Sequence, residues 1–324
     1  MQVVLIAQPI AMEGADILSG EGFEVRRLSR CDHRELLDAV GEAGGLLVRD
    51  ARVDREIIDA GRKLKVISRH GAGLEAIDLE AATEKGVQVT YTPRANYLSV
   101  AEHVLAMMLA LAKNMLRADK AVRNGHFDFR HEHYGMELGG ATLGIVGLGS
   151  IGTALARKAS AGLDMRVIGY DPHVSTPPVG VEMAGDLGRL LAESDFVSLN
   201  VALTSETVGL IGKEELALMK PTAYLINCAR GALVVEEELV ASLRGGRLAG
   251  AGMDVFSDDP PLPGNPLFGM ENTVLTPHMA AHTTAAMTRM AIEAAQGIVE
   301  VLKGRRVTWP ANQLAATSGP SGRL

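Results

Sequence analysis

An apolar run at residues 142–146 leads directly into Gly147, Gly149 and Gly152, in the segment TLGIVGLGSIG. In a turn from strand to helix, the first glycine permits the tight bend, the second admits a pyrophosphate close to the backbone, and the third lets the helix pack on the strand. A helix beginning near Ile151 presents unpaired N–H groups and the positive end of its dipole, which stabilise phosphate oxygens. The spacing therefore predicts a dinucleotide site.

Asp171 supplies the second half of this pattern, because it ends the next apolar run, residues 167–171. At this distance from the glycines, a carboxylate accepts hydrogen bonds from the ribose 2′-hydroxyl of NAD. The same carboxylate repels the 2′-phosphate of NADP. We therefore expect NAD to be the cofactor.

Short apolar runs alternate with segments of helical character along the chain, a pattern typical of parallel α/β structure. Before the glycine motif, the expected strands cover residues 3–7, 23–28, 45–48, 64–68 and 87–91, and the expected helices cover 35–40, 56–60, 79–85 and, as one long apolar helix, 98–122. After the motif, the expected strands cover residues 196–199, 223–228, 248–255 and 273–275.

The length of the chain predicts two domains. A chain of 324 residues, 47% of them apolar, exceeds the size at which one hydrophobic core usually divides. The glycine motif lies in the middle of the chain, so the second α/β unit is either inserted into the first or appended to it. The amphipathic stretch 284–302 is expected to return to the first unit.

Composition and charge exclude several classes of protein. A net charge of −7 without a long Lys/Arg cluster argues against nucleic acid as a partner. Cys31 and Cys228 stand in no disulfide or zinc pattern, and the histidines lack metal-ligand spacing, so no metal is expected and the cytoplasm fits best. The first ten residues lack the charged start and long apolar segment of a signal peptide, so none is expected there, and the apolar stretch 104–112 is too short to cross a bilayer.

The motifs, taken together and in their order, resemble the D-isomer-specific 2-hydroxyacid dehydrogenases over essentially the whole chain. Besides the glycine loop they are RHGAGLEAID (69–78), TPRANYLSVAEH (92–103), INCARG (226–231), AGMDVFSDDPP (251–261) and LTPHMAAHT (275–283). The resemblance implies two Rossmann-like or flavodoxin-like parallel-sheet domains with the active site in the cleft between them. Residues 1–98 and 285–324 would form the substrate domain, and residues 99–284 the inserted dinucleotide-binding domain.

The resemblance also assigns the catalytic residues to Arg230, Asp259 and His278, and their chemistry agrees. Oxidation of a 2-hydroxy acid needs a base for the hydroxyl proton, and histidine titrates in the useful range. A guanidinium grips a carboxylate through two parallel hydrogen bonds. A carboxylate beside the imidazole fixes its tautomer and favours the imidazolium. The family usually has Glu at position 259, so Asp258 stays open as the partner, as does His282 as the base.

Further contacts follow from the resemblance. Asp254 is expected to hold the nicotinamide carboxamide, and backbone groups near Ala72 and Gly73 to meet the substrate carboxylate. Arg49 and Arg69 match positions that face a distal phosphate in phosphoglycerate-type relatives, and Arg94 adds a third cation. The remaining expected cofactor contacts are Ser150, Ile151, Thr204, Cys228 and Ala229.

These expectations combine into an NAD-dependent oxidoreductase of the cytoplasm, homodimeric through the long helix, that acts on a 2-hydroxy or 2-keto acid. A phosphoglycerate-like substrate with an anionic tail, hydroxypyruvate and glyoxylate all stay open. An NAD(H)-sensing binding protein similar to dehydrogenase-related corepressors is the alternative of another class. Formate oxidation is disfavoured, because those relatives usually carry an amide where Asp259 stands. The sequence ends soon after Trp309, so no appended regulatory domain is expected.

Overall fold

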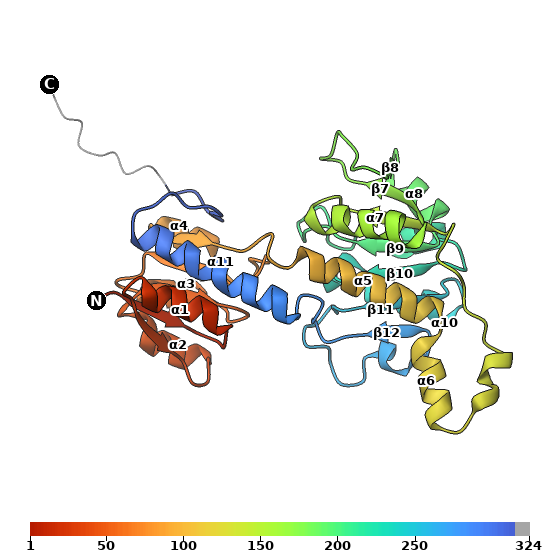
Figure 1. Ribbon diagram of the computed structural model, residues 1–324, viewed down its shortest axis with the longest axis horizontal. Coiled ribbons are helices and arrows are strands. Elements are labelled where there is room, and N and C mark those ends of the chain that lie inside the picture. Colours follow the sequence, from red (N-terminus) through yellow and green to blue (C-terminus); the bar gives the residue numbers. More distant parts are fainter. Residues whose placement is uncertain (315–324) are drawn as a thin grey trace. The chain divides into compact units, whose positions relative to one another are not determined.

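The computed structural model describes residues 1–314, which fold into two compact units (Figure 1). Among the described residues, the first unit combines Met1–Asn96 with residues 282–314, and the second is Tyr97–Ala281. Each contains a parallel sheet covered by helices, so the expected α/β class is confirmed. The assignment of substrate to the first unit and dinucleotide to the second stays a prediction.

The first unit has a five-stranded parallel sheet in the flavodoxin-like order β2-β1-β3-β4-β5. Its strands are β1 (Val3–Ile6), β2 (Glu24–Arg27), β3 (Ala43–Val48), β4 (Val66–Arg69) and β5 (Gln88–Thr90). Its helices are α1 (Met12–Gly20), α2 (His33–Val40), α3 (Arg55–Ala60), α4 (Leu79–Glu84) and α11 (Thr284–Leu302). Helices α1 and α11 cover one face of the sheet, and α2, α3 and α4 cover the other (Figure 1).

Helix α11 confirms the expected return of the chain to the first unit. Thr283 caps it by accepting a hydrogen bond from the Ala286 N–H at 3.2 Å. The helix packs closely on α1, because a Cβ added to Gly14 would lie 2.6 Å from the Ala291 carbonyl oxygen. Helix α1 itself was not predicted, since its two glycines weaken the helical signal of the sequence.

The second unit has a seven-stranded parallel sheet in the order β12-β11-β10-β9-β6-β7-β8. Its strands are β6 (Thr142–Val146), β7 (Arg166–Tyr170), β8 (Glu182–Met183), β9 (Phe196–Leu199), β10 (Tyr224–Asn227), β11 (Gly250–Met253) and β12 (Thr273–Leu275). Its helices are α5 (Tyr97–Ala112), α6 (Met115–Arg123), α7 (Ser150–Leu163), α8 (Leu187–Glu193), α9 (Lys213–Leu218) and α10 (Glu236–Arg244), with 3₁₀ turns η1 (Phe127–His131), η2 (Gly231–Leu233) and η3 (Pro266–Gly269). The strand order reverses between β6 and β9, which is the switch point where such sheets bind ligands.

The central strands of this sheet are buried on both faces. Strands β6, β9 and β11 have no exposed residue, which explains why each is mostly apolar in the sequence, without alternating polar positions. Helices α5 and α7 cover one face, and α8, α9 and α10 pack against the other. The loops at the strand ends are therefore anchored to a sheet that is packed between helices on both faces.

The prediction of one long helix over residues 98–122 was wrong. The chain forms two helices, α5 and α6, bent by 58° at a short break. Asn114 has a left-handed backbone, with φ of +53°, and its side chain donates to the Tyr134 carbonyl oxygen at 3.3 Å. Asparagine tolerates this conformation better than most residues, and the apolar composition on both sides hid the break.

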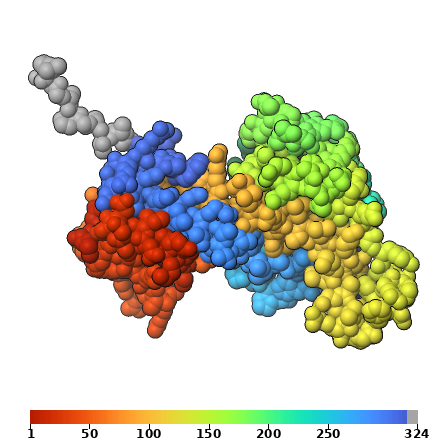
Figure 2. Space-filling model, viewed as in Figure 1, coloured from red at the N-terminus to blue at the C-terminus, as the bar shows by residue number. Residues whose placement is uncertain are grey.

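Helix α6 and the following turn η1 project from the second unit (Figure 2). Among the apolar side chains exposed there are Met115, Leu116, Val122 and Phe127. Within residues 1–314, no single helix is long and apolar enough to span a membrane. Only α5 and α6 together reach that length and composition, and they are bent relative to each other.

Candidate functional site

The carboxyl edge of the second sheet gathers the residues singled out in the sequence. Gly147 follows β6, and Asp171 follows β7. Arg230, Asp259 and His278 follow β10, β11 and β12, which are neighbours in the sheet. Because parallel strands end at the same edge, these five residues stand on one side of the unit.

The glycine loop has the geometry of a phosphate cradle. Gly147 has a φ of +92°, and a Cβ there would lie 2.6 Å from the Asn200 carbonyl oxygen at the end of β9. A Cβ on Gly152 would lie 2.0 Å from the Gly147 carbonyl oxygen. The helix can therefore approach the strand this closely only because residue 152 has no side chain. Gly149 faces open space, which is where a pyrophosphate needs room. The loop thus fits a dinucleotide.

Asp171 is held against this loop. One carboxylate oxygen, Oδ2, accepts from the Leu148 N–H at 2.9 Å, and Oδ1 accepts from the His173 N–H at 2.9 Å. A carboxylate oxygen accepts more than one hydrogen bond, so both can still receive ribose hydroxyls. Ser150 and Ile151 begin α7 beside it, as expected for the helix whose N-terminus faces the phosphates.

His278 and Asp259 form a direct pair, with Nδ1 and Oδ2 separated by 2.5 Å. Both side chains are about half exposed, 50% and 47%, so the imidazole is accessible to a small molecule. The contact is made by Asp259 and not by the neighbouring Asp258, and the shorter side chain at position 259 therefore reaches the imidazole. With Nδ1 engaged, Nε2 is the ring atom positioned to exchange a proton.

The buried carboxylate of Asp254 fixes the turn that carries His278 through hydrogen bonds to its backbone. His278 has a φ of +50°, a conformation that side-chain-bearing residues rarely adopt, and its N–H donates to the Asp254 carbonyl oxygen at 2.8 Å. The fully buried Asp254 side chain accepts from the Met279 and Ala280 N–H groups, each at 2.9 Å. It also accepts from Thr276 Oγ1 at 2.5 Å. Asp254 thus shapes the turn, and its expected contact with nicotinamide stays a prediction.

Arg230 is half-buried in the loop after β10. Its Nη1 donates to the Ala229 carbonyl oxygen at 2.7 Å, and its own carbonyl oxygen accepts from Asn227 Nδ2 at 2.9 Å. A Cβ added to Gly231 would lie 1.7 Å from the Phe256 carbonyl oxygen. The loop carrying Arg230 therefore packs directly on the loop that leads to Asp259.

The other expected cofactor contacts in this unit lie on loops at the same edge of the sheet. Cys228 and Ala229 follow β10, and Thr204 lies in an exposed turn after β9, where its N–H donates to Thr207 Oγ1 at 2.8 Å. Burial, with a smaller contribution from Asp254, raises the pKa of the Cys228 thiol well above its usual value, so the thiol is protonated. Within residues 1–314, no three His, Cys, Asp or Glu side chains are grouped so that they could hold a metal ion.

In the first unit, Arg49 and Arg69 are brought together by Asp50. Arg49 Nη2 lies 4.0 Å from Oδ2 of Asp50, and Arg69 Nη2 lies 3.5 Å from its Oδ1. Arg69 Nε also donates to the Gly73 carbonyl oxygen at 2.9 Å. Burial, and then the charge of Arg49, lower the pKa of His70 to about 4, so that imidazole is neutral at neutral pH. The two guanidiniums therefore lie close to each other beside one carboxylate.

The remaining expected substrate contacts of this unit lie nearby in the sequence. Ala72 is exposed and immediately precedes Gly73. Arg94 is exposed, with its guanidinium carbon 5.3 Å from the centre of the Trp309 ring. Trp309 thus fixes Arg94 by a cation–π contact, whereas Asp50 joins the other two arginines.

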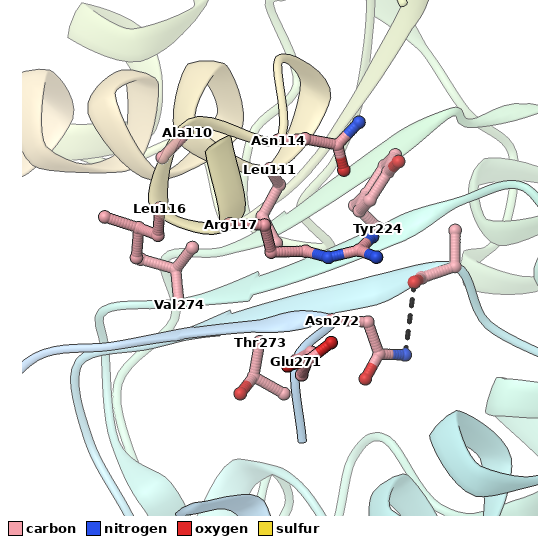
Figure 3. Close-up of a pocket in the computed structure, with 11 residues that line it drawn as sticks. Ala110, Leu111, Asn114, Leu116, Arg117, Tyr224, Glu271, Asn272, Thr273 and Val274 are labelled. Carbon is pink, nitrogen blue, oxygen red and sulfur yellow. Dashed lines mark hydrogen bonds between the residues drawn. The ribbon is translucent and has the colours of Figure 1, made fainter. Parts of the chain in front are cut away.

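A separate cavity of about 150 Å³ lies at the opposite edge of the second sheet (Figure 3). Its lining includes Arg117, Tyr224 and Thr273, and the last two are the first residues of β10 and β12. The residues predicted to be catalytic follow the other ends of these strands. This cavity is therefore not the candidate active site.

The sequence gives no sign of the full role of Glu236. Its acidic run, residues 236–238, is accounted for by the favourable charge at a helix N-terminus, and α10 does begin there. In the structure the Glu236 carboxylate also accepts hydrogen bonds from Ser257 and Asn265, on either side of Asp259. No spacing rule connects a helix N-terminus to a loop beyond the next strand, so the sequence carries no signal for these contacts.

Comparison with known proteins agrees with this geometry. The family model described as "D-isomer specific 2-hydroxyacid dehydrogenase, NAD binding domain" matches residues 105–280. The chain is 39% identical over 305 residues to D-3-phosphoglycerate dehydrogenase of Archaeoglobus fulgidus, covering 93% of this chain and 57% of that protein. It is 42% identical over 278 residues to glyoxylate reductase of Thermofilum pendens, covering 83% of this chain and 81% of that protein. The crystal structure of the TT0316 protein from Thermus thermophilus is similar, with a TM-score of 0.89, 38% identity and coverage of 96% and 100% of the two chains.

Proposed function

Because the chain belongs to the D-isomer-specific 2-hydroxyacid dehydrogenase family, we propose that it transfers hydride between NAD and C2 of a D-2-hydroxy acid or its 2-keto acid. The observation that carries this proposal is the His278–Asp259 pair, at the same sheet edge as Arg230 and the glycine loop. Bound NAD supplies the hydride acceptor or donor, and the side chains of this edge supply proton and charge.

Each catalytic side chain has a distinct role in this proposal. His278 accepts the hydroxyl proton at Nε2 during oxidation and returns it during reduction. Asp259 holds Nδ1–H and stabilises the imidazolium that forms. Arg230 binds the substrate carboxylate and polarises the C2 oxygen, where negative charge develops in reduction.

Asp171 is proposed to select NAD over NADP. Replacing Asp171 with alanine removes the acceptor for the ribose hydroxyls and the repulsion of a 2′-phosphate. The ratio of kcat/KM for NADH to that for NADPH is expected to fall by roughly 10- to 100-fold. Because general damage to the loop lowers both values, the ratio serves as its own control. An unchanged ratio would place recognition of the ribose elsewhere.

The substrate is proposed to carry an anionic tail, which Arg49 and Arg69 recognise. Both guanidiniums approach the same Asp50 carboxylate, at 4.0 Å and 3.5 Å, so two cationic side chains stand close together in the first unit. The relatives named above include both a phosphoglycerate and a glyoxylate enzyme, so a tail-free substrate is the alternative. The chain spans 57% of the first relative's length, and that enzyme's substrate is not transferred by similarity alone.

A panel of 2-keto acids tests the function and the tail together. Consumption of NADH is measured with 3-phosphohydroxypyruvate, hydroxypyruvate and glyoxylate in parallel. We expect turnover with at least one of them, and the highest kcat/KM with the phosphorylated acid. Highest efficiency with glyoxylate would refute the anionic tail. Saturable NADH binding without turnover on any member would refute the enzyme and favour a cofactor-sensing protein.

We also propose that the protein is a cytoplasmic homodimer. The exposed apolar side chains of α6 offer a surface for a second copy of the chain, as the family resemblance implies. Cys31 and Cys228 stand in no disulfide pattern in the sequence, which favours a reducing compartment. Sedimentation velocity at micromolar concentration tests the assembly, and a single monomeric species would refute it. Fractionation of the source cells tests the location.

A further inference from the structure

Glu236 fastens the loop that carries Asp259 on both of its sides. Oε2 of Glu236 accepts from the Ser257 N–H at 3.1 Å, two residues before Asp259. Oε1 accepts from Asn265 Nδ2 at 2.6 Å, six residues after it. Asn265 in turn caps η3, because its Oδ1 accepts from the Leu267 N–H at 2.9 Å.

The loop between these two contacts is open to solvent. Residues 257–260 and 262–264 are exposed, and Pro261 is half-buried. An exposed segment with few apolar contacts is mobile unless hydrogen bonds anchor it. Glu236 is itself half-buried at the first position of α10, which packs on the sheet, so it is a firm support.

The length of the Asp259 side chain makes this support important. An aspartate carboxylate stands only one methylene from the backbone, so the reach of Asp259 to His278 depends directly on where the loop backbone lies. A displacement of about 1 Å at a catalytic group can lower the rate by roughly 100-fold. A displacement of that size away from the imidazole would stretch the contact between Oδ2 and Nδ1 beyond the usual hydrogen-bond distance.

We propose that Glu236 is a positioning residue that holds the loop where Asp259 can orient the imidazole of His278. It touches neither substrate nor cofactor in this role and acts only through the loop backbone. The inference rests on the proposed function for its kinetic consequence. Its structural consequence, a fixed imidazole tautomer with the proton on Nδ1, does not depend on any activity.

The test replaces Glu236 with alanine and with glutamine, and uses Glu237→Ala as the matched control. Glu237 is the next residue of the same helix turn and is exposed. We expect kcat to fall roughly 10- to 100-fold in Glu236→Ala, with KM for NADH unchanged. Glu236→Gln keeps one acceptor oxygen, so its loss is expected to be smaller. Glu237→Ala is expected to match the parent protein.

Rescue separates positioning from a general structural role. The double variant Glu236→Ala, Asp259→Glu has a longer carboxylate arm, which can reach the imidazole from a displaced loop. We expect it to regain at least a third of the lost kcat. Loss of activity in Glu236→Ala without any rescue would overturn the proposal, as would full activity in Glu236→Ala.

A spectroscopic measurement keeps the test independent of turnover. In protein labelled with ¹⁵N-histidine, the His278 ring nitrogens are assigned with a His278→Gln sample. We expect one tautomer, protonated at Nδ1, in the parent and in Glu237→Ala, and a mixture of tautomers in Glu236→Ala. If the parent reduces no 2-keto acid, the proposed function fails, and this measurement alone decides the role of Glu236. An unchanged His278 spectrum in Glu236→Ala refutes it.

Discussion

Replacing His278 with glutamine is expected to lower kcat/KM for reduction of the preferred 2-keto acid by roughly 10²- to 10⁴-fold. This is the usual range for removal of a general acid or base. The imidazole is paired with Asp259, half exposed, and mounted on a turn fixed by Asp254, so it is placed to pass a proton to a bound substrate. Steady-state kinetics with NADH measures the loss.

The matched control for this variant is His282→Gln. His282 is an exposed histidine four residues further along the chain and is the competing candidate for the base. Its replacement is expected to leave kcat/KM within about twofold of the parent protein, as for surface substitutions away from a site. A large loss in His282→Gln together with an active His278→Gln would reverse the assignment.

Replacing Arg230 with alanine is expected to lower kcat/KM by roughly 10²- to 10³-fold, while the dissociation constant for NADH stays within about threefold. In the proposed function the guanidinium binds the substrate carboxylate and stabilises charge at the C2 oxygen, and it does not bind the cofactor. Arg230→Lys is expected to recover little, since an ammonium cannot form the bidentate contact. Fluorescence titration of NADH and steady-state kinetics measure the two effects separately.

Arg244→Ala is the control, because Arg244 is an exposed arginine in the last turn of α10 in the same unit. It is expected to behave like the parent. Equal loss of NADH affinity and turnover in Arg230→Ala would contradict the substrate role and place the guanidinium at the cofactor.

The sequence predicted the parts of the fold that depend on local pattern. Strands buried on both faces, such as β6 and β9, lie where they were expected, because a short continuous apolar run between turn residues is typical of such a strand. The break between α5 and α6 was missed because it depends on one residue, Asn114, with a left-handed backbone. The helical spacing of apolar residues continues on both sides of Asn114, so the sequence pattern does not mark the break. Helix α1 was missed because its glycines, including the one packed on α11, resemble a turn.

In the candidate site, too, features set by a local motif could be predicted, and features that depend on tertiary contacts could not. The cradle around Gly147 and Gly152 and the contact of Asp171 with Leu148 follow from one local motif. The His278–Asp259 pair could be expected only through resemblance, since nothing in the spacing decides between Asp258 and Asp259. Glu236 was beyond prediction, because its contacts join segments that only the tertiary structure brings together.

The left-handed backbone at His278 has a consequence for how this protein tolerates change. A residue with a Cβ is disfavoured in that conformation by roughly 1–2 kcal/mol, whereas glycine adopts it freely. Replacing His278 with glycine would therefore relieve the backbone but remove the imidazole to which the proposed function assigns proton transfer. If the proposed function holds, position 278 is a site where stability and activity favour different residues.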